Sequence, residues 1–407
     1  MRYAIIGAAL SGNKGAASML EATIQQIASR DADATFDVLT VYPEMDAVQN
    51  ERESVSIHDA SPLRLGVVIN GASLLHKLLP PLRKTIERAV PEVGALANAD
   101  VMIDEGGITF VDGRGKFLIY NVATLLPALF LGTPVVKGAQ AMGPFEKKLN
   151  RISAKALLPR MKAIVARGDQ TDEYLSSLGL RNVVRGADMA FAMETADSDQ
   201  RALAQSVDLS FFERGDVVGF SPSVVLAKAA ARKDVDYVGQ AARTIDAITE
   251  NLGRPVAIIA HSARKGSEKT HNNDLPLCRE IYARVADPDR VLLLDDELDP
   301  RELRTLIGMC DVFVASRFHA MVSSLAQGVP TLVIGWSHKY GEVLSDFGQA
   351  DFGLSLDDAE PARVQAMVQK LIDERAERSE QIQAALENVR RQSQEQFDLI
   401  AAGAALN

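Results

Sequence analysis

The chain alternates along its whole length between short apolar runs rich in β-branched residues and stretches with helical periodicity. This alternation is typical of βαβ units and a parallel sheet, so the predicted fold class is α/β. The predicted strands are 2–6, 36–41, 101–103, 134–137 and 163–166 in the first half, and 217–220, 256–260, 291–294, 312–315 and 331–334 in the second. The predicted helices are 16–29, 74–89, 117–131 and 171–178, then 236–251, 275–286, 301–309 and 320–327.

A polar stretch at 194–205 separates two runs of this pattern. It is the expected hinge, because its acidic and small residues cannot bury a face. A chain of 407 residues is also too long for one compact core. We therefore expect two Rossmann-like doubly wound domains facing a central cleft, at 1–200 and 207–360, followed by a charged helical tail at 361–407. Ligands of such domains bind at the carboxyl ends of the strands.

Composition narrows the classes of partner. The formal net charge of −10, from 44 basic and 54 acidic side chains, argues against a nucleic-acid partner, which calls for a basic face. The two cysteines, Cys278 and Cys310, have no metal-type spacing and are too few for a disulfide framework, so we expect a cytoplasmic protein with no metal. The longest apolar stretch, 117–131, is too short to cross a bilayer and is predicted to be a buried helix.

Three polar residues follow the predicted strand 312–315 at the entrance to a helix: Ser316, Arg317 and His319. The N-terminus of a helix favours negative charge, and an arginine adds a bidentate grip on a carboxylate or phosphate. A histidine there can donate a hydrogen bond or a proton near neutral pH. This position predicts a site for a small anion. The alternatives are a structural ion pair for Arg317 and a core histidine for His319.

These residues belong to the segment CDVFVASRFHAMVSSLAQGVPTLVIGWSHKYGEVLSDFG, which resembles the signature region of the polysaccharide pyruvyl transferase family. The family has an Arg-x-His after a strand, a small-residue helix, Gly-Val-Pro, another strand and then a lysine. Arg317, His319, Gly328, Pro330 and Lys339 stand at those places. The segments TPVVKGAQAMGPFEKKLNR, IVARGDQTDEYLSSLGLRNVVRGADMAFAM and IIAHSARKGSEKTHNNDLPLCREI also resemble the family, in the same order.

The resemblance implies a fold similar to GT-B glycosyltransferases. It also implies transfer of a pyruvyl group from phosphoenolpyruvate to a saccharide as a ketal, in the synthesis of an exopolysaccharide or cell-wall polymer. No cofactor is implied besides this donor substrate. The acceptor is expected to be lipid-linked or nucleotide-linked, and a lipid-linked acceptor would bring the protein to a membrane surface.

Such chemistry needs cations for the donor's carboxylate and phosphate, and groups that move protons. Arg317 and Lys339 suit the first task, and His319 suits phosphate binding or proton donation. Arg167, at the end of a predicted first-domain strand, is expected to reach the same anion across the cleft. The alternative is a surface arginine paired with Asp169, which here follows an intervening Gly168 where the family has the aspartate directly after the arginine.

Further candidates follow other strands. His261 ends the strand 256–260 and is a predicted substrate-binding residue, with Arg264, Lys265, Lys269 and Asp274 on the loop that follows. That loop is expected to close over substrate, or else to be a solvated charged loop.

The first domain offers two polar segments. The stretch IIGAALSGNKGAASML places Asn13 and Lys14 in a glycine-containing loop between a strand and a helix, although the acidic residue often found in the family after the loop glycine is replaced by Ala16. The other segment follows the strand 101–103. It combines two candidate bases for a sugar hydroxyl with two glycines that permit close backbone approach, and the alternative is a tight turn with surface carboxylates. These residues are Asp104, Glu105, Gly106 and Gly107.

Two other functions stay open at this stage. One is a GT-B glycosyltransferase that uses a nucleotide sugar, but retaining members usually have a Glu pair around the helix that follows Arg317, and no acidic residue lies between Ala315 and Gly335. The other is a noncatalytic saccharide-binding member of the family, which the departures at Ala16 and Gly168 permit.

Overall fold

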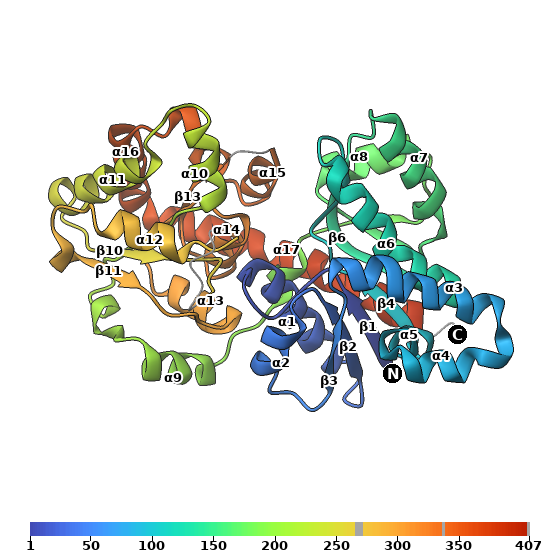
Figure 1. Ribbon diagram of the computed structural model, residues 1–407. Helices are drawn as coiled ribbons and strands as arrows, with labels where there is room; N and C mark the ends of the chain where they lie inside the picture. Colours follow the sequence, from blue (N-terminus) through green and yellow to red (C-terminus); the bar gives the residue numbers. More distant parts are fainter. Residues whose placement is uncertain (265–271, 336–337, 405–407) are drawn as a thin grey trace. The chain divides into compact units, whose positions relative to one another are not determined.

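A computed structural model describes residues 1–264, 272–335 and 338–404, except for the side chains of His338 and Lys339 (Figure 1). The chain forms two compact units. The first consists of Met1–Ser11, Met19–Met193 and the end of the chain from Arg390, and the second of Gly12–Ser18 and Glu194–Val389.

The first unit is built on a parallel sheet with the strand order β3-β2-β1-β4-β6-β7-β8, and β5 pairs with β6 beside it. The strands are β1 (Arg2–Ile6), β2 (Thr35–Thr40), β3 (Val55–Asp59), β4 (Val101–Asp104), β5 (Ile108–Val111), β6 (Val135–Gly143), β7 (Ala163–Arg167) and β8 (Val183–Gly186). The helices are α1 (Lys14–Ala28), α2 (Pro43–Gln49), α3 (Asn70–Leu78), α4 (Arg83–Ala89), α5 (Pro91–Ala97), α6 (Gly115–Leu131), α7 (Lys148–Leu157) and α8 (Asp169–Ser177). The parallel order follows from the helices that connect successive strands.

The core of this unit lies where the apolar side chains of the sheet meet those of α5, α6 and α7. The prediction that 117–131 is a buried helix is only partly right. Its helix α6 buries one stripe, but Phe117 is 59% exposed and Ile119 is 77% exposed. The single helix predicted at 74–89 is also wrong, since Pro80 and Pro81 separate α3 from α4. Proline has no N–H for a helical hydrogen bond and clashes with the preceding turn.

The second unit has a parallel sheet with the order β11-β10-β9-β12-β13-β14. Its strands are β9 (Val218–Ser221), β10 (Val256–Ile259), β11 (Val291–Leu294), β12 (Val312–Ala315), β13 (Thr331–Gly335) and β14 (Gly353–Ser355). Its helices are α9 (Asp197–Ser206), α10 (Val224–Ala231), α11 (Tyr237–Asn251), α12 (Leu275–Tyr282), α13 (Pro300–Gly308), α14 (Phe318–Ala326), α15 (His338–Asp346) and α16 (Pro361–Asp373). The prediction of two doubly wound parallel-sheet units is confirmed.

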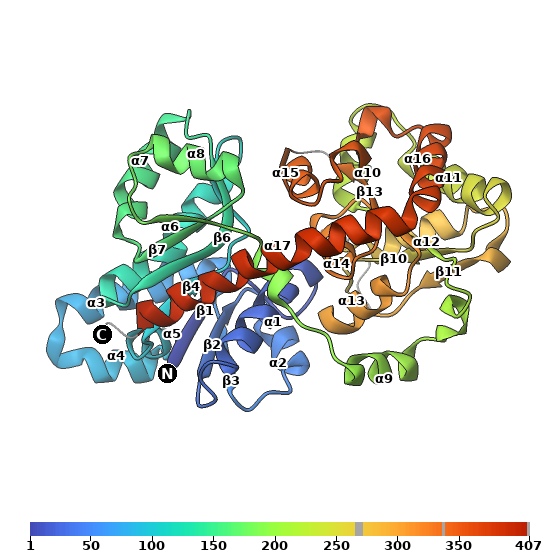
Figure 2. The ribbon, with the colours of Figure 1, turned by 180° about the vertical axis from the view of Figure 1, so that it is seen from behind.

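The end of the chain does not form a separate tail. Helix α16 buries Val364, Val368 and Leu371 in the core of the second unit. Helix α17 (Arg375–Ala404) is one continuous helix of 30 residues, and its last part packs on the sheet of the first unit (Figure 2). A Cβ placed on Gly403 would lie 3.2 Å from the Val136 side chain. Although α17 carries many charged side chains, its buried apolar side chains pack it against the rest of the protein.

Candidate functional site

In the second unit, polar residues gather at the carboxyl ends of β10 and β12. These strands flank β9 in the sheet, so their carboxyl ends share one edge. His261 comes two residues after β10, and Arg317 directly precedes α14. His319 lies in the first turn of α14, and Ser316 is buried, with its N–H donating to the Ser221 carbonyl at 2.9 Å. The residues that the sequence predicted after these two strands therefore lie in one cluster.

The guanidinium of Arg317 is held by Asp274, the residue directly before α12. Nε donates to Asp274 Oδ2 at 2.9 Å and Nη2 donates to Oδ1 at 2.6 Å, and the Asp274 side chain is fully buried. Nη1 donates to Asn272 Oδ1 at 3.3 Å. Burial acts against the charge of Arg317, but the Asp274 carboxylate outweighs it and the pKa of Arg317 is raised.

The structural ion pair considered for Arg317 thus exists, and it does not use up the side chain. An arginine has five N–H groups. Three of them donate to Asp274 and Asn272, so the other two N–H groups have no partner among the described residues. The ion pair fixes the orientation of the guanidinium and keeps donors for an anion.

His261 is buried beside this pair. Burial, followed by the positive charges of His319, Arg317 and Arg304, lowers the pKa of His261 well below 6.5. Its Nε2 has no hydrogen-bond partner among the described residues. A neutral imidazole with an unused ring nitrogen is suited to hydrogen bonding with a ligand rather than to charge neutralisation.

Asn13 and Lys14, the first residue of α1, belong to the second unit, although they fall within the range 1–200 predicted for the N-terminal domain. Asn13 forms an isolated antiparallel bridge with Ser262, and its Oδ1 accepts a hydrogen bond from the Gly15 N–H at 3.1 Å. Lys14 Nζ forms a buried ion pair with Glu297 at 3.0 Å. Asn13 Oδ1 and Lys14 Nζ are therefore already engaged within the protein.

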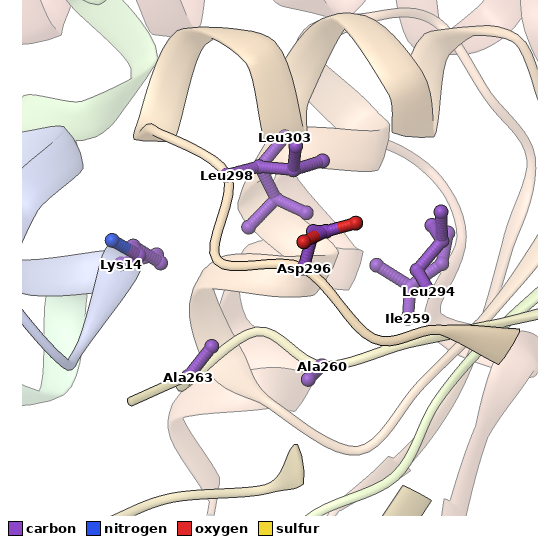
Figure 3. Close-up of a pocket in the computed structure, with 8 residues that line it drawn as sticks. All are labelled: Lys14, Ile259, Ala260, Ala263, Leu294, Asp296, Leu298 and Leu303. Atoms are coloured by element: carbon purple, nitrogen blue, oxygen red, sulfur yellow. The ribbon is translucent and has the colours of Figure 1, made fainter. Parts of the chain in front are cut away.

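Lys14 also lines a small pocket with residues that follow β10 and β11. Figure 3 shows the Asp296 carboxylate among the side chains of Leu294, Leu298 and Leu303, with Lys14 at the edge of the pocket. The walls are mostly apolar, so the pocket is less suited to a dianion than the cluster around Arg317.

Gly15 allows α1 to approach the His319 ring, and this contact gives a testable prediction. A Cβ on Gly15 would lie 2.2 Å from His319 Nδ1 and 2.5 Å from its Cγ. Gly15→Ala is therefore expected to lower the free energy of unfolding by about 1–3 kcal/mol, because the ring must move out of its packed position. Chemical denaturation measures this change.

Gly71→Ala in α3 is the matched control. A Cβ on Gly71 meets nothing within 4 Å. This substitution is expected to stabilise the protein by roughly 0.5–1 kcal/mol, because alanine favours the helix over glycine. If both variants are stabilised, the close contact between α1 and His319 is wrong.

In the first unit, a second cluster lies at the carboxyl ends of β4, β6 and β7. Asp104 ends β4 and forms a buried ion pair with Lys137 of β6, and its Oδ1 accepts a hydrogen bond from the Gly106 N–H at 2.9 Å. Asp104 is thus held in place and is less available as a base than the sequence suggested. Lys137 was missed, although a lysine inside an apolar strand was a signal for a buried ion pair.

Arg167 is buried and pairs with Asp188, with Nη1 2.7 Å from Oδ2. The alternative of a surface arginine paired with Asp169 is wrong, since Asp169 pairs with Arg185. Gly168 has a φ of +85°, a conformation that favours glycine. The residue inserted before Asp169 therefore turns the chain away from Arg167, and the more distant Asp188 supplies the carboxylate.

Glu105 is the carboxyl group of this cluster that stays available. It is 1% exposed, and apart from the nearby Thr23 hydroxyl neither of its carboxyl oxygens has a hydrogen-bond partner among the described residues. Burial raises the pKa of Glu105 to about 8, helped by the charges of Asp104 and Asp188 and opposed by the Thr23 hydroxyl. At neutral pH this carboxyl is mostly protonated. Because Asp104 and Glu105 are both buried, the alternative of surface carboxylates in a turn is wrong.

The two glycines after Glu105 have different surroundings. A Cβ on Gly106 would lie 2.8 Å from Thr109 Cγ2, so a side chain there would not fit. A Cβ on Gly107 would lie 3.9 Å from Arg167 Nη1. Gly107 therefore lies directly against the buried arginine.

Some of the predicted residues cannot be placed. Lys339 is the second residue of α15, but its side chain lies outside the described part of the chain, and so do Lys265 and Lys269. Among the described residues, no group of three or more His, Cys, Asp or Glu side chains could hold a metal ion.

Solved structures similar to this chain support the predicted fold. A putative UDP-N-acetylglucosamine 2-epimerase from Listeria monocytogenes has a TM-score of 0.62 and 12% identity, over 97% of this chain and 94% of that chain. A trehalose-phosphate synthase (UDP-forming) from Burkholderia vietnamiensis has a TM-score of 0.57 and 12% identity, over 99% and 98% of the two chains. At these identities the similarity concerns the fold, which is GT-B-like as predicted.

Sequence comparison also finds a related protein and a matching family. The chain is 22% identical over 417 residues to the amylovoran biosynthesis protein AmsJ of Erwinia amylovora, with 96% of each chain covered. The family model for polysaccharide pyruvyl transferases matches residues 13–338, which include both clusters described above. The chain therefore belongs to the polysaccharide pyruvyl transferase family.

Proposed function

We propose that the protein transfers the pyruvyl group of phosphoenolpyruvate to two hydroxyls of a saccharide, forming a ketal in the biosynthesis of an exopolysaccharide or cell-wall polymer. The observation that carries this proposal is the position of Arg317. Its guanidinium is oriented by Asp274 and lies at the N-terminus of α14, close to His261. His319 lies in the first turn of the same helix. The family match and the relative AmsJ support the broader function in polysaccharide biosynthesis.

The second unit takes the donor in this proposal. Phosphoenolpyruvate carries a carboxylate and a phosphate, and the two remaining N–H groups of Arg317 and the N–H groups at the start of α14 suit these anions. His261, being neutral, donates or accepts a hydrogen bond. His319 binds the phosphate or supplies a proton. Ser316 supports the turn between β12 and α14, and Lys339 adds a cation.

The reaction balances without a cofactor. A proton adds to C3 of phosphoenolpyruvate, which turns the methylene into a methyl group and makes C2 electrophilic. One acceptor hydroxyl oxygen then bonds to C2 and loses its proton. The second hydroxyl oxygen bonds to C2 as the C2–O bond to phosphate breaks, and inorganic phosphate leaves with the second proton. The enzyme must therefore supply an acid for C3 and accept protons from the sugar.

The first unit takes the acceptor in this proposal. Glu105 has unused carboxyl oxygens, while Gly106 and Gly107 expose backbone beside it and Arg167 is fixed by Asp188. With a pKa of about 8, Glu105 donates a hydrogen bond to the sugar at neutral pH and becomes a base as the pH rises. The acceptor is a lipid-linked or nucleotide-linked saccharide on the cytoplasmic side of the membrane.

Ligand-dependent thermal stability tests the donor. A ligand that binds only the folded state at a hundredfold excess over its Kd stabilises it by about 2.7 kcal/mol. We expect phosphoenolpyruvate to raise the Tm of the wild type and to have no such effect on Arg317→Lys. A lysine keeps the positive charge but loses the planar fork that Asp274 orients.

Arg279→Lys is the matched control, since Arg279 forms an exposed ion pair with Asp295. Each variant is compared with its own Tm without ligand, so that a loss of stability does not count as a loss of binding. If nucleotide sugars raise the Tm and phosphoenolpyruvate does not, the protein is a nucleotide-sugar glycosyltransferase instead. Phosphoenolpyruvate binding without phosphate release, over a panel of saccharides, would favour a noncatalytic family member.

A further inference from the structure

The first unit exposes an unusual number of large apolar side chains in one region. Of the 17 that are exposed in the described part of the chain, eight lie between Leu63 and Leu82. Four more, Phe117, Ile119, Leu149 and Ile152, lie at the starts of α6 and α7. We call these twelve side chains the apolar face. Isolated exposed apolar residues are ordinary, but a concentration of this kind marks an interaction surface.

Contacts within the unit link these segments along α6, with α3 beside its middle and C-terminal end and the start of α7 beside its N-terminal end. Helix α3 lies along α6, where the Asn70 amide donates to the Ala123 carbonyl at 3.0 Å and the Lys77 ammonium lies 6.0 Å from the centre of the Phe130 ring (Figures 1 and 2). The Asp112 carboxylate, just before α6, accepts hydrogen bonds from the Glu146 and Lys147 N–H groups, just before α7. The starts of α6 and α7 are therefore neighbours.

The same segments are basic in an acidic protein. Residues 60–86 contain four basic side chains and no acidic one, and residues 113–168 contain ten basic and one acidic. Together they carry a formal charge of +13 in a chain whose net charge is −10. Arg64, Lys84, Lys137 and Arg167 form ion pairs with neighbouring carboxylates. The others are exposed, so these segments contribute a surplus of positive charge to the surface.

The α3–α4 turn shows this combination most clearly. Leu75, Leu78 and Leu82 are 50%, 62% and 47% exposed, and Lys77 and Arg83 lie among them with exposed side chains. Apolar side chains interleaved with cations suit the boundary between lipid headgroups and acyl chains. The Glu87 carboxylate of α4 is already engaged by His76 and Lys84. Anionic headgroups add attraction for each cation near the surface. An acidic protein partner would match the positive charge, but it does not require so many adjacent exposed leucines. A neutral protein partner explains neither feature.

We propose that the apolar face docks the first unit on a bilayer that contains anionic phospholipids. The docking is peripheral, and none of the helices among the described residues is long and apolar enough to span a membrane. It rests on the protein's own side chains and does not depend on the pyruvyl donor or on a lipid-linked acceptor. It would hold the enzyme at the surface where lipid-linked saccharides are presented.

Vesicle flotation tests the proposal with the full-length protein. We expect binding to phosphatidylcholine vesicles that contain 30% phosphatidylglycerol, weaker binding to phosphatidylcholine alone, and a decrease with added salt. The variant with Leu75→Ser and Leu78→Ser is expected to bind at least about tenfold more weakly. The variant with Lys77→Gln, Arg83→Gln and Lys84→Gln is expected to bind roughly 100-fold more weakly to the anionic vesicles.

Matched controls change the same residue types elsewhere. Val48→Ser with Val225→Ser, and Arg232→Gln with Arg243→Gln, remove exposed apolar and basic side chains outside the apolar face and are expected to bind as the wild type does. The Tm of each variant checks folding.

Two results would overturn the proposal. One is that anionic vesicles do not bind the protein, or bind all variants equally. The other is self-association, seen by light scattering without lipid and abolished by the leucine substitutions, which would assign the apolar face to a second copy of the chain.

Discussion

Asp274→Ala is expected to lower the free energy of unfolding by about 3–5 kcal/mol. The substitution removes the fully buried carboxylate that binds Arg317 through two hydrogen bonds, and leaves the guanidinium charge in a largely buried site. Asp274 Oδ1 also accepts a hydrogen bond from the Val224 N–H at 2.9 Å, so a buried backbone donor loses its partner too. Chemical denaturation measures the loss.

The neighbouring pair of Arg279 and Asp295 provides the control. Both side chains are more than a third exposed, so Asp295→Ala is expected to cost no more than about 1 kcal/mol. Asp274→Asn is expected to fall between the two, because an asparagine keeps one acceptor without the charge. Equal losses for Asp274→Ala and Asp295→Ala would mean that Asp274 does not hold Arg317. The proposed orientation of the anion site would then fail with it.

The strands were largely predictable because they are apolar and β-branched. Strands β1, β11 and β12 have the predicted bounds, since each is a short buried run between polar loops. The strands that were missed are β3, β5, β8 and β14. Three of these, β3, β8 and β14, lie at sheet edges and have half-buried or exposed side chains, so no buried run marks them.

The hinge predicted at 194–205 shows where composition misleads. Helix α9 occupies most of it. Asp199 is buried, accepts a hydrogen bond from the Ala196 N–H at 2.7 Å and lies 3.5 Å from Arg301. Acidic residues in a first turn stabilise a helix by capping it and by meeting its positive end. They indicated a helix start rather than a stretch unable to fold.

For the candidate sites, position in the fold was predictable and pairing was not. Residues placed directly after strands, such as Glu105, Arg167 and Arg317, do lie at the carboxyl edges of the sheets. Their partners are far along the sequence. Asp274 lies 43 residues from Arg317, and Asp188 lies 21 residues from Arg167. Only the fold decides which carboxylate reaches which cation, so the charge state of each site could not be derived from spacing.

Glu105→Gln is expected to remove much of the pH dependence of stability between pH 5 and 8. The pKa of Glu105 is about 8 in the folded protein, against an ordinary value of 4.5. Between these values the folded state holds a proton that the unfolded state has released, so the free energy of unfolding falls as the pH rises. Over the full interval the loss is on the order of 5 kcal/mol, at 1.36 kcal/mol for each unit of pKa. Glutamine is neutral throughout and escapes this loss.

Chemical denaturation of both proteins at pH 5, 6, 7 and 8 measures the difference. The glutamine amide adds its own desolvation cost, which shifts the whole curve but leaves its slope unchanged, so the slope is the quantity to compare. Glu53→Gln, at an exposed position, controls for the loss of one acidic group and is expected to keep the wild-type slope. Parallel curves for wild type and Glu105→Gln would mean that Glu105 is ionised in the folded protein at neutral pH. A carboxylate of that kind would act on a sugar hydroxyl as a base from the outset, whereas a raised pKa makes it a hydrogen-bond donor first and a base only as the pH approaches 8.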